Sequence, residues 1–323
     1  MIPHVNKPLV DRIERKRGIS RASSRTYASV LRRIHRDYSN DDWSNNLKWL
    51  QKNHIFEKIK KIPSINVRRN LVNASIVGLS LSDANHSKYD HLLEELKIKA
   101  TQENRKQEMS VRQKKNFVSW KDIIKLRAQL AKQVRLKRLY AKPSLTLKEF
   151  MLLQRNLVLH LYTSIDPIRL DFAGMRVVPE KQFKNIKNKN ENFLVLARGG
   201  YKFYFWKFKT SRSRELPVVV KASRTLVSVL KKHVAVLRRR FGENLLLLYN
   251  AKGGEMNRNS LSKFLTSIFV SYFDKKISAS MLRTIFLSHK YAGTNILERE
   301  ATAERMMHSR TTAEQSYIKK IPK

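Results

Sequence analysis

Five residues in the second half of this 323-residue chain could together cleave a phosphodiester. They are Arg169, Lys209, Arg283, His308 and Tyr317. A phenol can attack phosphorus as a nucleophile, and guanidinium and imidazole groups can stabilise the negative charge of the transition state. A lysine ammonium can protonate the oxygen that leaves. Each residue type is common alone, so the inference depends on the order of the five and on their local sequence contexts.

The charge of the chain favours a polyanionic partner. It holds 67 Lys and Arg against 26 Asp and Glu, for a formal net charge of +41. An AT-rich genome could enrich Lys, Asn and Ile in the protein. Arg is abundant too, however, as in the run at 238–240, and acidic residues are not correspondingly enriched. Nucleic acid therefore explains the charge better than composition bias does.

The sequence disfavours several other classes of protein. The chain has no cysteine, which excludes disulfides, thiol catalysis and cysteine zinc sites and points weakly to a reducing compartment. We find no apolar stretch near 18 residues, and residues 1–16 are too polar for a signal peptide. No expected helix separates a basic face from a broad apolar one, so a membrane-surface protein is disfavoured. We expect a soluble protein that is not secreted.

The first hundred residues predict a small helical bundle. Apolar residues recur at helical spacing in four segments, at 25–38, 42–52, after Pro63 and at 88–100. The opposite faces carry Arg32, Arg33, Arg36, Arg68 and Arg69. A DNA-clamping bundle would use such a basic face for phosphate contacts, although solvated side chains on exposed helix faces would give the same pattern. We expect an N-terminal arm at 1–19, a helical domain at 20–100 and a polar linker at 101–116, where few apolar residues could form a core.

Residues 117–323 predict a second domain with helices and a small sheet. Ser119 and Asp122 resemble a capping box, and a long apolar helix follows at 146–163. Short segments of strand character lie at 175–178, 193–197, 201–208 and 215–220, which predicts a small antiparallel sheet. Helical patterns return at 222–240, 260–273, 279–291 and 296–307, with a last short one around Tyr317. The expected fold class is mostly α with a small antiparallel sheet, as a helical domain followed by an α+β domain.

The context of Arg169 resembles the first arginine box of the tyrosine recombinase (phage-integrase) family. It reads Leu-Tyr-Thr-Ser-Ile-Asp-Pro-Ile-Arg-Leu-Asp-Phe, between the long apolar helix and the first strand. A planar guanidinium at this point could hold two phosphate oxygens. The family usually has an acidic residue three positions after this arginine. Here Phe172 occupies that position, and Asp171 lies one position earlier.

Lys209 resembles the β-hairpin lysine of the same family. It lies between two segments of strand character, and the Lys-Thr pair is followed by Pro217. A flexible ammonium at a hairpin tip could protonate the leaving 5′ oxygen. Lys202 and Lys207 are competing candidates, but turn residues follow Lys209 alone of the three.

The segment from 277 to 286 resembles the second box, which is usually His-x-x-Arg on a helix. Arg283 takes the arginine position, and Ser280 stands in place of the histidine. A serine cannot serve as an imidazole acid or base, although it could donate a hydrogen bond to phosphate. Ser280 is therefore a further candidate with a modified role. His289 is not in register to replace the missing histidine.

His308 and Tyr317 form the strongest local match to the family. In tyrosine recombinases a phosphate-binding histidine or tryptophan precedes the nucleophilic tyrosine by nine residues, as it does here. Nine residues do not lie on one face of a continuous helix. Thr311 and Glu314 form a capping-box pattern, which predicts a turn after His308 and a new helix that presents Tyr317.

The resemblance covers nearly the whole chain and implies a mechanism. Tyr317 would attack a DNA phosphate to give a 3′-phosphotyrosyl link and a free 5′ hydroxyl, and a partner strand would then attack the link. Because the link conserves the bond energy, no metal, nucleotide or other cofactor is needed. The implied partner is double-stranded DNA, bound by a dimer per site and a tetramer overall, in integration or excision of a viral or mobile element. The protein would act wherever that DNA lies, in a host nucleus or in a viral or bacterial cytoplasm.

Two alternatives remain open at this point. A type IB topoisomerase shares the tyrosine chemistry but reseals the same strand. A DNA-binding protein derived from a recombinase could have lost activity, with Ser280 as the first sign. An RNA-binding protein is less well supported, since the sequence has no aromatic-rich RNA-recognition strand. The target sequence, the direction of the reaction, the host and any accessory factor do not follow from the sequence.

Overall fold

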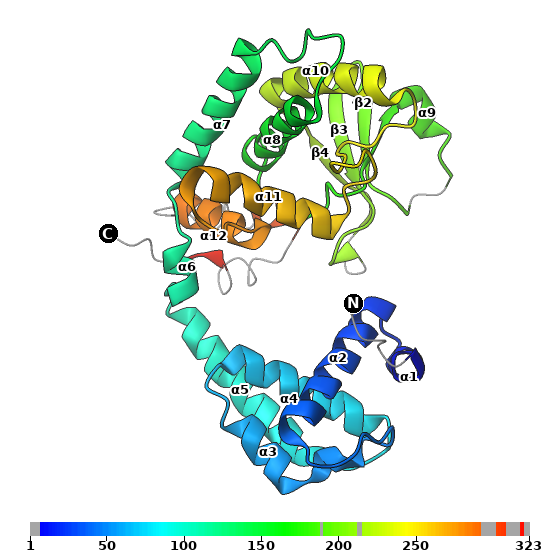
Figure 1. Ribbon diagram of the computed structural model, residues 1–323, viewed down its shortest axis with the longest axis vertical. Helices are drawn as coiled ribbons and strands as arrows, with labels where there is room; N and C mark the ends of the chain where they lie inside the picture. Colours follow the sequence, from blue (N-terminus) through cyan, green and yellow to red (C-terminus); the bar gives the residue numbers. More distant parts are fainter. Residues whose placement is uncertain (1–6, 188–189, 212–214, 292–301, 308–316, 320–323) are drawn as a thin grey trace. The chain divides into compact units, whose positions relative to one another are not determined.

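Short polar side chains open many of the helices, as the sequence predicts. Ser20, Ser64 and Thr146 each accept a hydrogen bond from the backbone N–H three residues later. The computed structural model describes residues 7–187, 190–211, 215–291, 302–307 and 317–319 (Figure 1). Those residues are mostly helical and include a small sheet, which confirms the expected fold class. The chain divides into two compact units, Met1–Lys106 and Gln107–Lys323.

The described secondary structure of the first unit is entirely helical. Its elements are α1 (Lys7–Arg17), α2 (Arg21–Tyr38), the 3-10 helix η1 (Lys48–Gln51), α3 (Asn53–Lys60), α4 (Ile65–Ser80) and α5 (Ser87–Arg105). The single helix expected at 42–52 is thus replaced by η1 and α3. Leu47, in the left-handed conformation with φ 58°, starts η1 and prevents a continuous helix there.

Helix α4 lies at the centre of the first unit, beside α2 and α5 (Figure 1). Its buried surface covers much of the helix rather than one stripe, and consists of Leu71, Val72, Ala74, Ser75, Val77, Gly78 and Leu79. Gly78 allows the closest approach: a Cβ at this position would lie 2.8 Å from a Leu50 methyl and 2.9 Å from a Leu31 methyl. A larger residue would require these leucine side chains to shift.

Two segments expected to lack packed structure are helical. Residues 7–17, expected within an arm, form α1, and Leu9, Val10 and Ile13 are buried in the core of the first unit. Residues 101–105, expected within a linker, continue α5, and a Ser110–Gln113 capping box opens α6 (Val111–Lys115). Residues 7–17 were not predicted as a helix because only three spaced apolar residues dock α1, whereas α6 has no buried residue and begins with its capping box.

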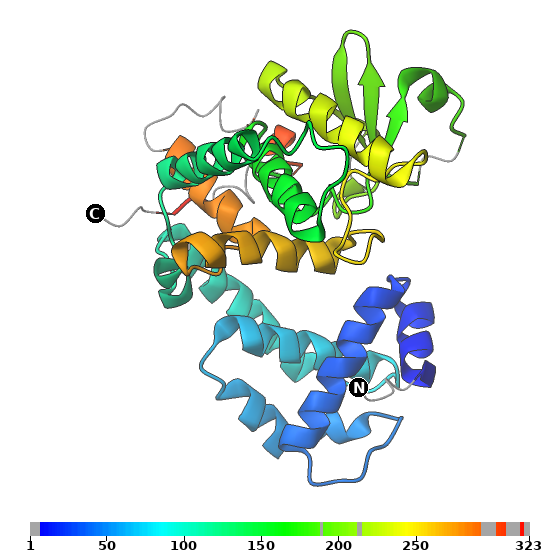
Figure 2. The same cartoon turned by 45° about the horizontal axis from the view of Figure 1, so that its top comes forward.

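The second unit combines a helical layer with the sheet. Its elements after α6 are α7 (Trp120–Leu136), α8 (Leu147–Thr163), β1 (Arg176–Pro179), α9 (Glu180–Lys184), β2 (Phe193–Ala197), β3 (Gly200–Phe205), β4 (Val218–Lys221), α10 (Arg224–Phe241), α11 (Arg258–Phe273) and α12 (Ala279–Lys290). Helix α8 buries ten of its 17 residues and contacts α7, α10 and α11 (Figure 2). It is the long apolar helix that the sequence predicts.

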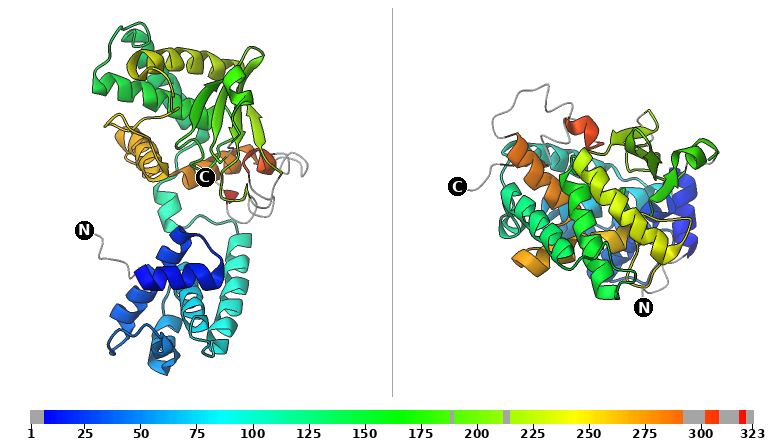
Figure 3. Two further views of the ribbon diagram at one scale, coloured as in Figure 1. Left: turned by 90° about the vertical axis from the view of Figure 1, so that its right-hand side faces the viewer. Right: turned by 90° about the horizontal axis from the view of Figure 1, so that it is seen from above.

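The described strands form one sheet of order β1-β2-β3-β4 (left view of Figure 3). The β2–β3 and β3–β4 pairs are antiparallel as expected, but β1 and β2 are parallel, so the sheet is mixed. A parallel pair needs a crossover, and the segment that contains α9 supplies it. Phe203 and Phe205 point into the main core of the second unit, whereas Tyr204 packs on the other face with Phe193.

None of the described helices is both long and apolar enough to cross a lipid bilayer.

Candidate active site

Arg283 and Tyr317 are in direct contact. The Nη1 atom of Arg283 donates a hydrogen bond of 2.6 Å to the phenolic oxygen of Tyr317. The guanidinium carbon also lies 4.2 Å from the centre of the tyrosine ring. Arg283 lies on α12, whose neighbouring residues Leu282 and Ile285 are buried in the core, so the helix carries the arginine inward with them. The two predicted residues are thus brought together.

The guanidinium of Arg283 is buried but incompletely paired. Its exposed fraction is 0%, and its Nε and Nη2 atoms have no hydrogen-bond partner among the described residues. The pKa of Arg283 is lowered to about 10, mainly by burial and also by the charge of the nearby Arg169, while the interactions with Tyr317 and Asp171 act in the opposite direction. Buried donors without acceptors are costly, and an anion bound here would satisfy them.

Arg169 lies close to the same group. Its backbone carbonyl accepts a hydrogen bond of 2.6 Å from the buried Tyr162 hydroxyl at the end of α8. The half-buried Arg169 side chain donates from Nη1 to the Met307 carbonyl at 3.5 Å. Because Arg169 affects the pKa of Arg283, both predicted arginines belong to one electropositive region.

The Met307 carbonyl joins three of the predicted segments. It accepts from Arg169 and also, at 3.1 Å, from the Thr210 hydroxyl. Thr210 follows the predicted Lys209, and Met307 immediately precedes the predicted His308. Met307 has φ 55°, the left-handed conformation that ends a helical turn. A backbone carbonyl therefore connects these segments. Such a contact cannot be predicted from the pattern of side chains in the sequence.

Lys209 is exposed in a turn after β3, on the connection that leads to β4. Its neighbour Phe208 is buried in the core and anchors the turn. Of the competing lysines, Lys202 lies within β3 and Lys207 is exposed just after it. The placement in a turn agrees with the sequence expectation. No described contact joins the Lys209 ammonium to Tyr317 or to either arginine.

Asp171 and Arg258 form an ion pair that the sequence did not predict. Asp171 is 2% exposed, and its Oδ1 accepts from Arg258 Nη1 at 2.7 Å. Burial raises the pKa of Asp171, and the charges of Arg258, Arg169 and Arg283 oppose that rise. The carboxylate therefore offsets part of the positive charge of this region. Phe172, at the position where the family usually has an acid, is a core residue.

Asn192 and Ser288 hold the backbone around these side chains. Asn192 Nδ2 donates to the carbonyls of Asp171 and Lys207, and its Oδ1 accepts from the Lys207 amide. Ser288 Oγ donates to the Tyr317 carbonyl at 3.4 Å and accepts from the Lys319 amide at 2.9 Å. Each is a short polar residue in a sequence rich in them, so no pattern singled it out.

The remaining predicted residues differ in status. Ser280 is exposed in the first turn of α12, and among the described residues no hydrogen bond of its side chain joins it to Arg283 or Tyr317. His289 is an exposed residue near the end of α12. His308 lies outside the described residues, as do Thr311 and Glu314 of the expected capping box.

The chain has no close relative among the known proteins compared with it. No protein-family model matches the sequence, and no curated protein matches it significantly. Among solved structures, the crystal structure of XerA recombinase is similar over 97% of this chain and 94% of that chain, with a TM-score of 0.41 and 11% sequence identity. Values this low support no conclusion about activity, which must come from the geometry of the site.

Proposed function

We propose that this protein cleaves and rejoins double-stranded DNA through a covalent bond between Tyr317 and a 3′ phosphate. The observation that carries the proposal is the buried Arg283, which donates to the phenolic oxygen of Tyr317 while its Nε and Nη2 atoms have no described acceptor. A phosphate beside the phenol would accept from these donors. The nucleophile and the group that binds the reacting phosphate would then be adjacent.

The reaction follows from the roles of these groups. The Tyr317 oxygen loses its proton to solvent and attacks phosphorus, and the bond from phosphorus to the 5′ oxygen breaks. Arg283 and Arg169 stabilise the negative charge of the transition state, with His308 as a further donor to the phosphate. Lys209 protonates the departing 5′ oxygen. Attack by a 5′ hydroxyl on the phosphotyrosyl link reverses these steps and rejoins a strand.

The charge and the helical first unit support DNA as the substrate. Arg33 and Arg36 are exposed on α2, and within the described residues their ion pairs are with Asp37 at the surface. Surface pairs of this kind are weak and can exchange for phosphate. Arg68 differs from the expectation of a free basic face, since its Nε and Nη2 donate to the Ile62 carbonyl and hold the turn before α4.

We further propose that the strands exchange within a tetramer, with a dimer at each site, during integration or excision of a viral or mobile element. A type IB topoisomerase and an inactive DNA-binding descendant are the competing functions. The exposed Ser280 in place of a histidine favours neither of them by itself, because Arg283 and Tyr317 remain paired.

The test begins by finding the DNA that the protein attacks. The full-length protein is incubated with a random-sequence duplex library, and DNA attached covalently to protein is recovered under denaturing conditions and sequenced. Nicked suicide duplexes are then built from the recovered sequences. Covalent adduct with transfer to a second duplex supports the proposal. Adduct with resealing of the same strand alone supports a topoisomerase, and specific binding without any adduct supports the inactive descendant.

A further inference from the structure

A pocket of about 700 Å³ lies in the second unit, between α7, α8 and α10. Its volume falls within the range of small-molecule sites. Its walls include Ala128, Ala131 and Val134 on α7 and Val229 on α10. None of the predicted active-site residues that the structure describes lines it. Nothing in the proposed cleavage mechanism uses this pocket.

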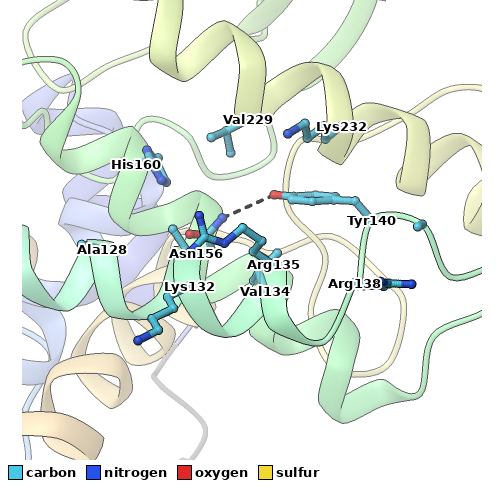
Figure 4. Close-up of a pocket in the computed structure, with 12 residues that line it drawn as sticks. Ala128, Lys132, Val134, Arg135, Arg138, Tyr140, Asn156, His160, Val229 and Lys232 are labelled. Atoms are coloured by element: carbon cyan, nitrogen blue, oxygen red, sulfur yellow. Dashed lines mark hydrogen bonds between the residues drawn. The ribbon is translucent and has the colours of Figure 1, made fainter.

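The buried end of the pocket is polar. Asn156 and His160 lie on α8 and are 2% and 6% exposed. Both ring nitrogens of His160 and the Oδ1 atom of Asn156 have no hydrogen-bond partner among the described residues. Figure 4 shows Asn156 beside Tyr140, whose hydroxyl accepts from Asn156 Nδ2 at 3.3 Å, and His160 further along α8 near Val229. Buried polar atoms of this kind are normally paired, so a partner with its own polar edge would fit.

The chemistry of this end is mixed rather than purely basic. Burial lowers the pKa of His160 to about 4, so its ring is neutral near pH 7 and offers one donor and one acceptor. Asn156 Oδ1 adds an acceptor, and the Tyr140 hydroxyl has a hydrogen to donate. An aliphatic tail placed here would leave these groups unpaired, which argues against a fatty acid.

The mouth of the pocket is cationic. Lys132, Arg135 and Arg138 line it from α7 and the turn that follows, and Lys232 lines it from α10 (Figure 4). All four are exposed residues. A ligand that fits therefore has a polar edge with donors and acceptors at one end, a body that packs between apolar walls, and negative charge at the other end.

The geometry points to a mononucleotide-binding site, with the base paired to Asn156 and His160 and the phosphates held by the basic residues at the mouth. A heteroaromatic base carries donors and acceptors along one edge and an apolar face. The phosphates match the charge of Arg135 and Lys232.

The test measures binding of ADP to the full-length protein by titration calorimetry, with EDTA present and DNA absent. We expect one ADP per chain. Ribose 5-phosphate lacks the base and should bind at least about 10-fold more weakly, because it leaves the buried groups unpaired. Asn156→Leu should weaken ADP binding to a similar degree, and Ala131→Trp should abolish it by filling the pocket. Thermal unfolding confirms that each variant is folded.

A matched pair of exposed lysines separates the pocket from general attraction to a basic protein. Lys232→Glu should weaken ADP binding at least about fivefold, whereas Lys231→Glu, which changes the same charge outside the pocket, should leave it within twofold. Equal effects of the two variants would overturn the proposal. So would the absence of ADP binding, or ADP binding that survives Ala131→Trp and is displaced by duplex DNA, which would place the nucleotide on a DNA-binding surface.

Discussion

The guanidinium of Arg283 lies over the ring of Tyr317 and donates a hydrogen bond to its oxygen, so one buried cation contacts both parts of the phenol. A cation over an aromatic face is stabilising, and a charged donor on the oxygen favours negative charge there. The same arginine keeps two donors without a described partner. This combination costs stability in the free protein and is useful only when an anion arrives.

Replacing Arg283 by methionine should separate stability from activity. Methionine fills a similar volume without a buried charge, so the free energy of unfolding should rise by about 1 kcal/mol or more. DNA cleavage should fall by about 10² to 10³ or more, because a preorganised charge donor is lost. Urea unfolding and single-turnover cleavage measure the two effects. Arg258→Met is the control: it leaves the buried Asp171 without its ion-pair partner and should lower stability. A destabilised Arg283→Met protein would contradict this account of the site.

Ser288 should act by positioning the nucleophile. Ser288→Ala removes the hydrogen bonds to the Tyr317 carbonyl and from the Lys319 amide. We expect cleavage to slow by about 10-fold, since small misplacements of reacting groups are costly, while DNA affinity stays within twofold. Ser288→Thr keeps the hydroxyl and should restore most of the rate. A variant whose cleavage rate and DNA affinity fall together would indicate a general structural defect instead.

The sequence predicted the secondary structure of the second unit better than the contacts of its site. The helix at 146–163 was predictable because the Thr146–Glu149 capping box precedes a long apolar run. The parallel pairing of β1 with β2 was not, because alternation shows that a strand exists but not its direction. In the first unit, helix α1 was not predicted because its three buried residues lie in a highly charged segment.

The site was predictable only as a set of residue types. The family resemblance identified Arg169, Arg283 and Tyr317, but spacing alone could not show that residues so far apart in the sequence touch. Asn192 and Ser288 act through backbone hydrogen bonds that many asparagines and serines could make. The Met307 carbonyl has no side-chain signature at all. These contacts depend on the tertiary fold, which local patterns do not encode.

Lys209 should be the acid that protonates the leaving group. Lys209→Ala should cleave ordinary DNA slowly but cleave DNA with a 5′-bridging phosphorothiolate at close to the wild-type rate, because sulfur leaves without needing a proton. Lys207→Ala, two residues earlier and also exposed, is the matched control and should be normal on both substrates. If Lys209→Ala is equally slow on both, the acid is another group, with Lys202 and Lys207 the next candidates.

The buried His233 should make stability depend on pH. Burial lowers its pKa to about 4, against about 6.5 in the unfolded chain, and neither ring nitrogen has a described partner. Between these values the unfolded state binds more protons, so the free energy of unfolding should fall as pH drops from 6.5 towards 4, by up to about 1.4 kcal/mol per pH unit from this residue. Urea unfolding at pH 7 and pH 5 should show a smaller loss in His233→Leu than in the wild type. An identical loss in both proteins would rule out His233 as a source of the pH dependence.

The most direct test of the central claim is to identify the residue bonded to DNA. The covalent complex is digested with nuclease and trypsin, and the modified peptide is sequenced by mass spectrometry. The account predicts a nucleotide on Tyr317, within the tryptic peptide that spans 311–319, and no adduct with Tyr317→Phe, which should still bind DNA within a few-fold of the wild type. A nucleotide attached to any other residue, or an undiminished adduct in Tyr317→Phe, would contradict it.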